Sequence, residues 1–411
     1  MLHYLKFANY FLSTMAGVTA ILFAQHWILL GFAIFVVFYV LGDAFFGEDL
    51  SQPELNNKAL LNIMLYASVP TTMLLLAVSL WLVTPYDWAI MQWLSATSAY
   101  DFIAAKEATN AFEIGVALVF CGLMLSGVAT VVGHELIHRI GNKKAVTTGR
   151  WLLAISFDAS FSIEHVFNHH VHVATEKDPV TAKRGTSVYA QVPLAIIRTS
   201  MAAWQIEKKR LTRKKQSIFS FHNQYITGWL MSVAWLSLAT VLGGWQGLLF
   251  VTGVGIAAKV ILEIVNYMEH YGLVRHPREP VRPRHSWNNN RRISCWAMFN
   301  LPRHSHHHAK GAVPFEKLEA MPDAPIMIGG YISTMLLVLI PPLWFSLMRP
   351  KLQHWDKTMA NEKELEIIAQ QAQDAVERKE KRLALIKSLH PMRFIQIMLA
   401  MMKNPIKGNN R

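Results

Sequence analysis

Cysteine is almost absent from this chain of 411 residues, which contains only Cys121 and Cys295. The two lie far apart and form no CxxC pair, which argues against a disulfide framework and against an iron–sulfur or rubredoxin-type centre within the chain. A flavin fingerprint and a haem motif are also missing from the sequence. If the protein carries out redox chemistry, the electrons must therefore arrive from outside the chain.

Acidic residues are scarce relative to basic ones, with 27 Asp and Glu against 40 Lys and Arg and a formal net charge of +13. The basic residues cluster in segments 139–150, 183–215 and 275–303, each of which borders an apolar run. Because no nucleic-acid recognition motif accompanies them, the charge predicts contact with anionic lipid and no nucleic-acid partner. Under the positive-inside rule these segments face the cytoplasm.

Long apolar runs are abundant, and 52% of the residues are hydrophobic. A bilayer-spanning helix needs about 20 apolar residues, and the runs that approach this length are 10–41, 59–83, 112–132, 226–245, 248–267 and the weaker, proline-containing 325–348. The first run fits either one long tilted helix or a tight helical hairpin. It is too long for a secretion signal and lacks a small-residue cleavage site. The sequence therefore predicts an all-α integral membrane protein with about six transmembrane helices.

The composition changes near the C-terminus, where charged residues alternate with apolar ones over 359–389. We expect a membrane-embedded domain over residues 1–355 and a charged, helical cytoplasmic tail over 356–411. Within this tail, residues 394–402 are apolar enough to dock on lipid headgroups.

Histidine is the residue type that needs an explanation, because nine of the 18 histidines form four groups. The spacing within the groups is mostly three or four residues, which places imidazoles on one helix face, where they can bind a common metal. Zinc needs only three or four protein ligands, so nine histidines indicate two metal ions. The nine are His134, His138, His165, His169, His170, His270, His304, His307 and His308.

The first group, HELIH (134–138), is an HExxH sequence at the end of an apolar run. In zinc proteases the two histidines bind the metal and the glutamate acts as the base, so this motif alone also fits an intramembrane protease. That interpretation needs one further ligand and leaves the other histidines unused. A metal transporter with cytoplasmic histidine tracts is a third interpretation.

The remaining groups favour a metal pair. In EHVFNHH (164–170), His165 and His169 are one helical turn apart, whereas the adjacent His170 must approach a metal from another direction. His172 is expected to lie outside the ligand set. All four groups follow the ends of apolar runs on the side that carries the basic segments, so they can converge in a cytoplasmic helical cap. The number of ligands and the apolar surroundings favour a redox pair over structural zinc.

These motifs resemble a known family. HELIHR (134–139), EHVFNHH (164–170), NYMEHYGL (266–273) and LPRHSHHHA (301–309) are similar to the histidine signatures of membrane-bound non-haem diiron alkane monooxygenases. This family is related to the xylene and cymene methyl hydroxylases and, more distantly, to membrane fatty-acid desaturases. RHSWNNN (284–290) and IPPLWF (340–345) also resemble the family, and the resemblance covers residues 10–355.

The resemblance implies that the nine histidines bind two Fe ions. Metal-bound imidazoles are usually oriented by carboxylates, and the candidates for this role are Glu135, Glu164, Asp178 and Glu269. One position departs from the family, which usually has aspartate where this chain has His306. His306 could form a hydrogen bond in place of that carboxylate or act as a pH-sensitive neighbour.

The resemblance also implies the reaction: O2-dependent hydroxylation of the terminal carbon of n-alkanes to primary alcohols. Methyl-group hydroxylation of alkyl-arenes is the alternative. Because an alkane has no polar group, selectivity must come from an apolar channel between the spans.

The implied electron donor is a rubredoxin, or a ferredoxin-type protein, with its NAD(P)H-dependent reductase. A basic cytoplasmic face suits an acidic donor. The expected location is the inner membrane of a bacterium, with the active-site side in the cytoplasm.

Overall fold

The computed structural model describes residues 2–388, which form helices and two isolated β-bridges. The elements up to the first histidine group are α1 (Leu2–Leu5), η1 (Lys6–Ala8), α2 (Asn9–Phe23), α3 (His26–Phe45), α4 (Lys58–Tyr66), α5 (Ser68–Val83), α6 (Ala89–Thr97), α7 (Phe102–Glu107), α8 (Ala111–Leu125), η2 (Ser126–Thr130) and α9 (Val131–Ile137). The elements that follow are α10 (Lys143–Ala154), α11 (Phe161–Glu164), η3 (His165–His169), α12 (His170–His172), α13 (Val188–Arg213), α14 (Gln224–His270), η4 (Pro283–His285), α15 (Arg292–Ala297), α16 (His304–Ala309), η5 (Phe315–Lys317), α17 (Tyr331–Val338), α18 (Pro341–Thr358) and α19 (Glu362–Ser388). The prediction of an all-helical membrane protein is confirmed.

The chain divides into two compact units between Met359 and Ala360. The boundary expected at residues 355 and 356 falls inside α18, which continues to Thr358. The second unit begins with α19, whose first turn is closed by reciprocal hydrogen bonds between the side chains and backbone N–H groups of Asn361 and Glu364. The expected headgroup-docking segment 394–402 lies outside the described residues.

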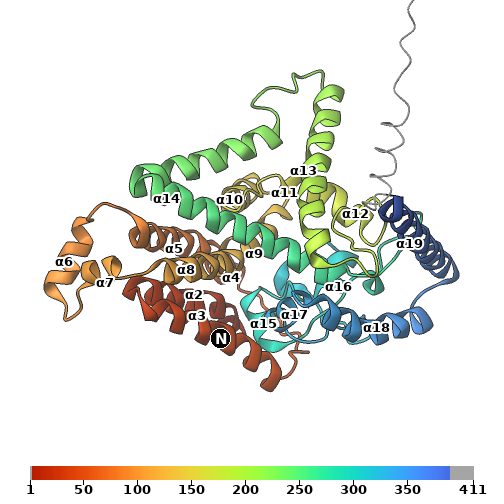
Figure 1. Ribbon diagram of the computed structural model, residues 1–411, viewed down its shortest axis with the longest axis horizontal. Helices are drawn as coiled ribbons and strands as arrows, with labels where there is room; N and C mark the ends of the chain where they lie inside the picture. Colours follow the sequence, from red (N-terminus) through yellow and green to blue (C-terminus); the bar gives the residue numbers. More distant parts are fainter. Residues whose placement is uncertain (1, 389–411) are drawn as a thin grey trace, which may run out of the picture. The chain divides into compact units, whose positions relative to one another are not determined.

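Five helical segments among the described residues are long and apolar enough to cross a membrane, or up to six if the bent pair α17 and α18 counts as one span. The segments are His3–Phe23, His26–Phe45, Lys58–Val83, Ala111–Ile137 and Gln224–His270. The apolar run 10–41 is therefore a helical hairpin and not one long tilted helix, the two alternatives that the sequence allowed. The chain turns at Ala24 and Gln25, both of which have positive φ, and α2 and α3 lie side by side (Figure 1).

The longest helix, α14, is two helices in practice. A straight helix of its 47 residues would extend about 70 Å, more than twice the roughly 30 Å of a bilayer core. Gly244 interrupts it with φ 64° and ψ −160°, a conformation that L side chains rarely adopt. The ribbon reverses direction within α14 (Figure 1). Its halves correspond to the two apolar runs expected over 226–245 and 248–267.

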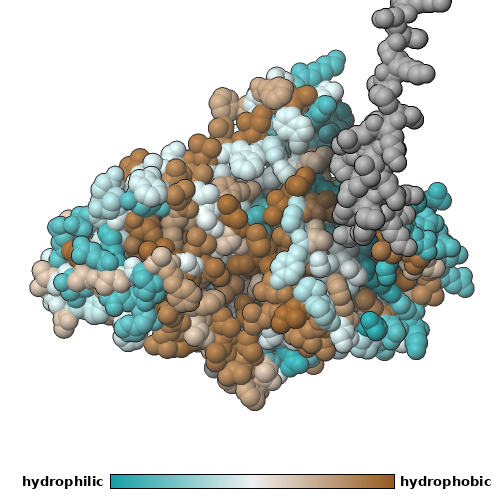
Figure 2. All heavy atoms as spheres, viewed as in Figure 1, coloured by the Kyte–Doolittle hydropathy of each residue, from teal (hydrophilic) through white to brown (hydrophobic). Residues whose placement is uncertain are grey.

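Apolar side chains cover the surface of the spans. Figure 2 shows hydrophobic residues gathered over the middle of the first unit and hydrophilic residues around α6 and α7. Leu12 and Ile34, on α2 and α3, are 63% and 59% exposed. Because a soluble protein rarely leaves so much contiguous apolar surface in water, this surface supports contact with lipid.

A close contact between α9 and α10 fixes the first histidine group. A Cβ atom on Gly149 would lie 2.8 Å from the carbonyl oxygen of Gly133 and 3.0 Å from Leu136 Cβ, both on α9. Backbone atoms cannot move aside as a flexible side chain can. Because neither Gly133 nor Gly149 has a side chain, α9 and α10 can pack this closely. This packing fixes the position of His134 on α9.

We expect Gly149→Ala to force α9 and α10 apart and to lower stability by about 1–3 kcal/mol, the usual cost of overpacking. A lower Tm and a reduced metal content of the purified protein would show the effect. Gly141→Ala is the matched control, because nothing lies within 4 Å of a Cβ at that position. Equal Tm values for the two variants would contradict the proposed contact.

Candidate metal centre

The structure brings all nine grouped histidines together from four separate parts of the chain. His134 lies on α9 and His138 at its C-terminal end, while His270 is the last residue of α14. The second and fourth groups lie on η3, α12 and α16. Nitrogen atoms of these side chains form two neighbouring sets, called here the five-histidine set and the four-histidine set.

The five-histidine set consists of His134, His138, His165, His170 and His307, whose potential ligand atoms all lie within 4.8 Å of one another. The Nε2 atom of His165 is 2.7 Å from His134 Nε2 and 3.0 Å from His170 Nε2. His138 Nε2 and His307 Nε2 are buried without a hydrogen-bond partner among the described residues.

The four-histidine set consists of His169, His270, His304 and His308. Their Nε2 atoms form a chain in which His169 is 3.2 Å from His308, His308 is 2.9 Å from His304, and His304 is 3.1 Å from His270. Glu269 completes a group with His270 and His304 within the same 4.8 Å limit.

Hydrogen bonding alone cannot satisfy these contacts. A neutral imidazole nitrogen either carries one proton or offers one lone pair, whereas His304 Nε2 faces His270, His308 and Glu269 at 3.1, 2.9 and 3.3 Å. Lone pairs that converge in this way are satisfied by a cation. The donor set therefore fits two metal ions, and imidazole suits iron, zinc and copper alike.

For six of the imidazoles, burial favours the neutral form that a metal ligand requires. Burial lowers the pKa of His138 to about 4. Burial is also the main reason that the pKa values of other histidines in the two sets lie well below 6.5. Those with pKa values well below 6.5 outside the spans are His165, His170, His304, His307 and His308.

Segment 165–169 differs from the α-helical spacing assumed from the sequence. It is a π-helix, in which the N–H of His170 donates to the carbonyl of His165. The wider turn pairs His165 with His170 in the five-histidine set and sends His169 to the four-histidine set. The pairing of His165 with His169 on one face was wrong, because a single π turn shifts the register.

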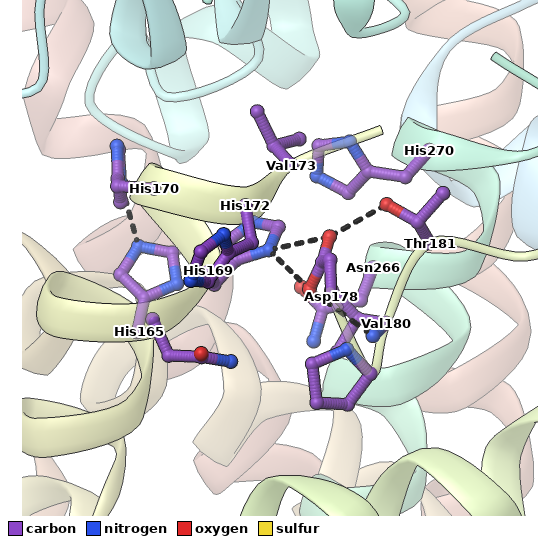
Figure 3. Close-up of polar contacts among 12 residues, drawn as sticks. His165, His169, His170, His172, Val173, Asp178, Val180, Thr181, Asn266 and His270 are labelled. Atoms are coloured by element: carbon purple, nitrogen blue, oxygen red, sulfur yellow. Dashed lines mark hydrogen bonds and ion pairs between the residues drawn. The ribbon is translucent and has the colours of Figure 1, made fainter. Parts of the chain in front are cut away.

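His169 is held by Asp178. Its Nδ1 atom lies 3.0 Å from each carboxylate oxygen, as Figure 3 shows. Asp178 also accepts hydrogen bonds from the Val180 N–H and the Thr181 hydroxyl, which fix the carboxylate. Burial acts to lower the pKa of His169, but the charge and hydrogen bond of Asp178 outweigh it and raise this pKa. The contact keeps a proton on Nδ1 and leaves Nε2 free for a metal.

The other three candidate carboxylates lie in different surroundings. Glu135 forms an ion pair with Arg139, with Nη2 to Oε1 at 3.1 Å, and Glu164 accepts a hydrogen bond from Asn168 at 2.9 Å. Glu269 is 3.3 Å from His304 Nε2. Of the four carboxylates, Asp178 contacts Nδ1 of His169, the nitrogen that faces away from the other histidines. Glu269 contacts Nε2 of His304, the nitrogen that faces His270 and His308.

His306 lies beside the cluster and belongs to neither set. Its Nδ1 accepts the backbone N–H of Glu319 at 2.7 Å. His172 belongs to neither set either.

We expect His306→Asp to retain metal and activity, because a carboxylate can accept the same backbone hydrogen bond. His306→Ala should remove the acceptor of the Glu319 N–H. Loss of this partly buried hydrogen bond costs about 0.5–1.5 kcal/mol and should lower Tm slightly without removing metal. Metal analysis and thermal unfolding of both variants check this. Metal loss in His306→Ala as complete as in His307→Ala would make His306 a ligand and contradict the prediction.

An apolar cavity adjoins the two sets. Tyr10 and Phe35 line it from α2 and α3, and Met124 lines it from α8. His134 and His304, one from each set, line the same cavity. A hydrophobic molecule in this cavity can therefore approach both metal positions.

Tyr331 lines this cavity too and was missed by the sequence analysis. Its hydroxyl donates a hydrogen bond to Glu269 at 2.6 Å. The residue lies in the weak apolar run 325–348, where a tyrosine carries no pattern that distinguishes it from a membrane-interface aromatic.

Comparison with known proteins agrees with this geometry. The family model for fatty acid desaturase matches residues 111–326. The chain is 39% identical over 237 residues to alkane 1-monooxygenase 1 of Pseudomonas aeruginosa, an alignment that covers 56% of this chain and 62% of that protein, less than two thirds of its length.

Other relatives align over more of their length. The alkane 1-monooxygenase of Ectopseudomonas oleovorans is 33% identical over 332 residues, which cover 76% of this chain and 75% of that protein. The xylene/toluene monooxygenase hydroxylase component of Pseudomonas putida is 36% identical over 250 residues, or 59% of this chain and 66% of that protein. With its histidine sets, helical spans and these relatives, the chain belongs to the alkane 1-monooxygenase family, within the fatty acid desaturase group.

Proposed function

We propose that this protein uses O2 to hydroxylate the terminal carbon of n-alkanes at a pair of iron ions held by the five-histidine and four-histidine sets. The observation that carries the proposal is that one apolar cavity is lined by imidazoles of both sets. The relatives named alkane 1-monooxygenase support the substrate class.

The overall reaction consumes one alkane, one O2, two electrons and two protons, and gives one alcohol and one water. Two bound irons would supply the redox chemistry that cleaves O2, which no amino-acid side chain can perform. The protein's own contribution is to bring the nine imidazoles together and to orient them. Asp178 does this for His169 through its contact with Nδ1.

The cavity provides binding and selectivity. Each CH2 group of an alkane that is buried in this apolar cavity stabilises binding by about 0.8 kcal/mol. A medium-length chain can therefore bind without a hydrogen bond. The same lining excludes water from the position at which the terminal methyl group meets the imidazoles. Phe35 packs against Phe120 and Tyr39, with ring centroids 5.5 and 4.7 Å away, and so limits the space available to the chain.

Methyl hydroxylation of alkyl-arenes is the second candidate. The relative named as a xylene/toluene monooxygenase hydroxylase component supports it. A zinc protease is less well supported, because Glu135, the base that such an enzyme needs, forms an ion pair with Arg139.

The partners and location follow from the same proposal. An external donor, a rubredoxin or ferredoxin-type protein with its NAD(P)H-dependent reductase, would deliver the electrons to the basic cytoplasmic face. The metal centre would lie on the cytoplasmic side of a bacterial inner membrane, since the basic segments surround the histidine groups.

The test is incubation of membranes that contain the protein with octane, hexadecane or p-xylene, together with rubredoxin, reductase, NADH and O2. We expect 1-octanol or 1-hexadecanol in excess of 4-methylbenzyl alcohol, and no alcohol from membranes with His307→Ala. Oxidation of p-xylene alone would favour the second candidate. No oxidation of any substrate would contradict both.

A further inference from the structure

The two histidine sets differ in their number of donors: five imidazoles form one group, whereas four are linked by pairwise Nε2 contacts in the other. Glu269 is positioned to make up the difference. It is 2% exposed and precedes His270 at the end of α14. Its Oε2 lies 3.3 Å from His304 Nε2, and its carboxylate forms a potential ligand group with His270 and His304.

The other carboxylate oxygen of Glu269 is held by a tyrosine. The Tyr331 hydroxyl, at the start of α17, donates to Oε1 at 2.6 Å. With Oε1 held in this way, Oε2 is the oxygen that faces the four-histidine set. The tyrosine itself is 2% exposed, so water does not compete for the bond.

Tyr331 is anchored in turn from two other helices. Its backbone N–H donates to Ser294 Oγ at 3.0 Å. The Ser294 hydroxyl and N–H donate to the two carboxylate oxygens of Asp43, at 2.5 and 3.0 Å. Asp43 is 1% exposed and lies near the end of α3. The hydroxyl of Tyr331 is therefore presented to Glu269 from a fixed backbone.

We propose that Glu269 is the fifth protein donor of the four-histidine site and that Tyr331 is the positioning residue that turns Oε2 toward the ion. The proposal rests on the metal centre of the proposed function. It makes the two ion sites chemically different, because one has five neutral nitrogen donors and the other has four nitrogen donors and one anionic oxygen. An anionic oxygen stabilises the more highly charged state of a metal ion, so the two sites would differ in affinity and in redox potential.

The experiment compares the full-length protein with Tyr331→Phe and Glu269→Gln, all loaded with ⁵⁷Fe. Two quantities are measured: the rate at which a ferrous chelator removes each iron, and the Mössbauer spectrum. Tyr267→Phe is the matched control, because Tyr267 lies on α14 two residues before Glu269 but its hydroxyl donates to the carbonyl of Thr186 at 2.8 Å.

The wild-type protein should hold two irons and show two distinct quadrupole doublets. In Tyr331→Phe and Glu269→Gln we expect one iron to leave about 10- to 100-fold faster, the usual effect of losing a partner of a metal site. One doublet should change while the other stays as in the wild type. Tyr267→Phe should release both irons at the wild-type rates.

Two results would overturn the inference while leaving the proposed function intact: unchanged release and spectra in both variants, or equal acceleration of both irons. If the wild-type protein binds no iron, the proposed function fails together with the inference. Glu269→Gln preserves the size of the side chain, so it decides the question even if Tyr331→Phe does not fold.

Discussion

His134→Ala should reduce alkane hydroxylation by more than about 100-fold. Replacing a residue that only hydrogen-bonds to a metal ligand already lowers metal affinity or activity by about 10- to 100-fold. His134 Nε2 lies 2.7 Å from His165 Nε2 in the five-histidine set. Its removal opens that set, so the purified variant should hold at most one iron instead of two. Metal analysis and alcohol formation by membranes measure the two effects.

His172→Ala is the control for this loss. His172 follows the second histidine group closely in sequence but belongs to neither set. Its replacement should leave the iron content at two per chain. Full activity and two irons in His134→Ala would remove this residue from the ligand set.

A second large effect should come from omitting the electron donor. The detergent-solubilised protein given NADH, O2 and octane should form no alcohol, because the chain contains no cysteine tetrad or flavin fingerprint. Addition of rubredoxin and its reductase should restore turnover. Product measured by gas chromatography, with and without each component, provides the comparison.

Salt gives an independent check on the docking of this donor. If basic residues attract an acidic donor, raising the ionic strength from about 0.01 M to 0.15 M shortens the Debye length from about 30 Å to 8 Å and should raise the KM for the donor. Turnover with NADH alone would contradict the requirement for an external carrier.

Much of the fold and site could be predicted because membrane spans and histidine groups leave strong periodic signals. The apolar runs 226–245 and 248–267 correspond to the two halves of α14, divided at Gly244. The convergence of the histidine groups followed from their positions at the ends of spans. The sequence could not decide between a hairpin and a single helix for 10–41. The turn is made by Ala24 and Gln25 with positive φ, and neither is a Gly or Pro that would signal a turn.

The division of the histidines between two sets could not be predicted. Spacing of three or four residues assumes an α-helix, whereas η3 is a π-helix that pairs His165 with His170. The contact of Tyr331 with Glu269 joins residues 62 positions apart. Such a contact depends on how α17 packs near the end of α14, which no local pattern encodes.

The most direct test of the central claim, that nine histidines hold two redox-active ions, is the metal content of the purified full-length protein. Metal analysis combined with ⁵⁷Fe Mössbauer spectroscopy measures both the number and the identity of the ions. We predict about two irons per chain, both lost when the grouped histidines are replaced together. One zinc per chain, with no bound iron and with retention of that zinc after replacement of His169 and His308, would contradict it.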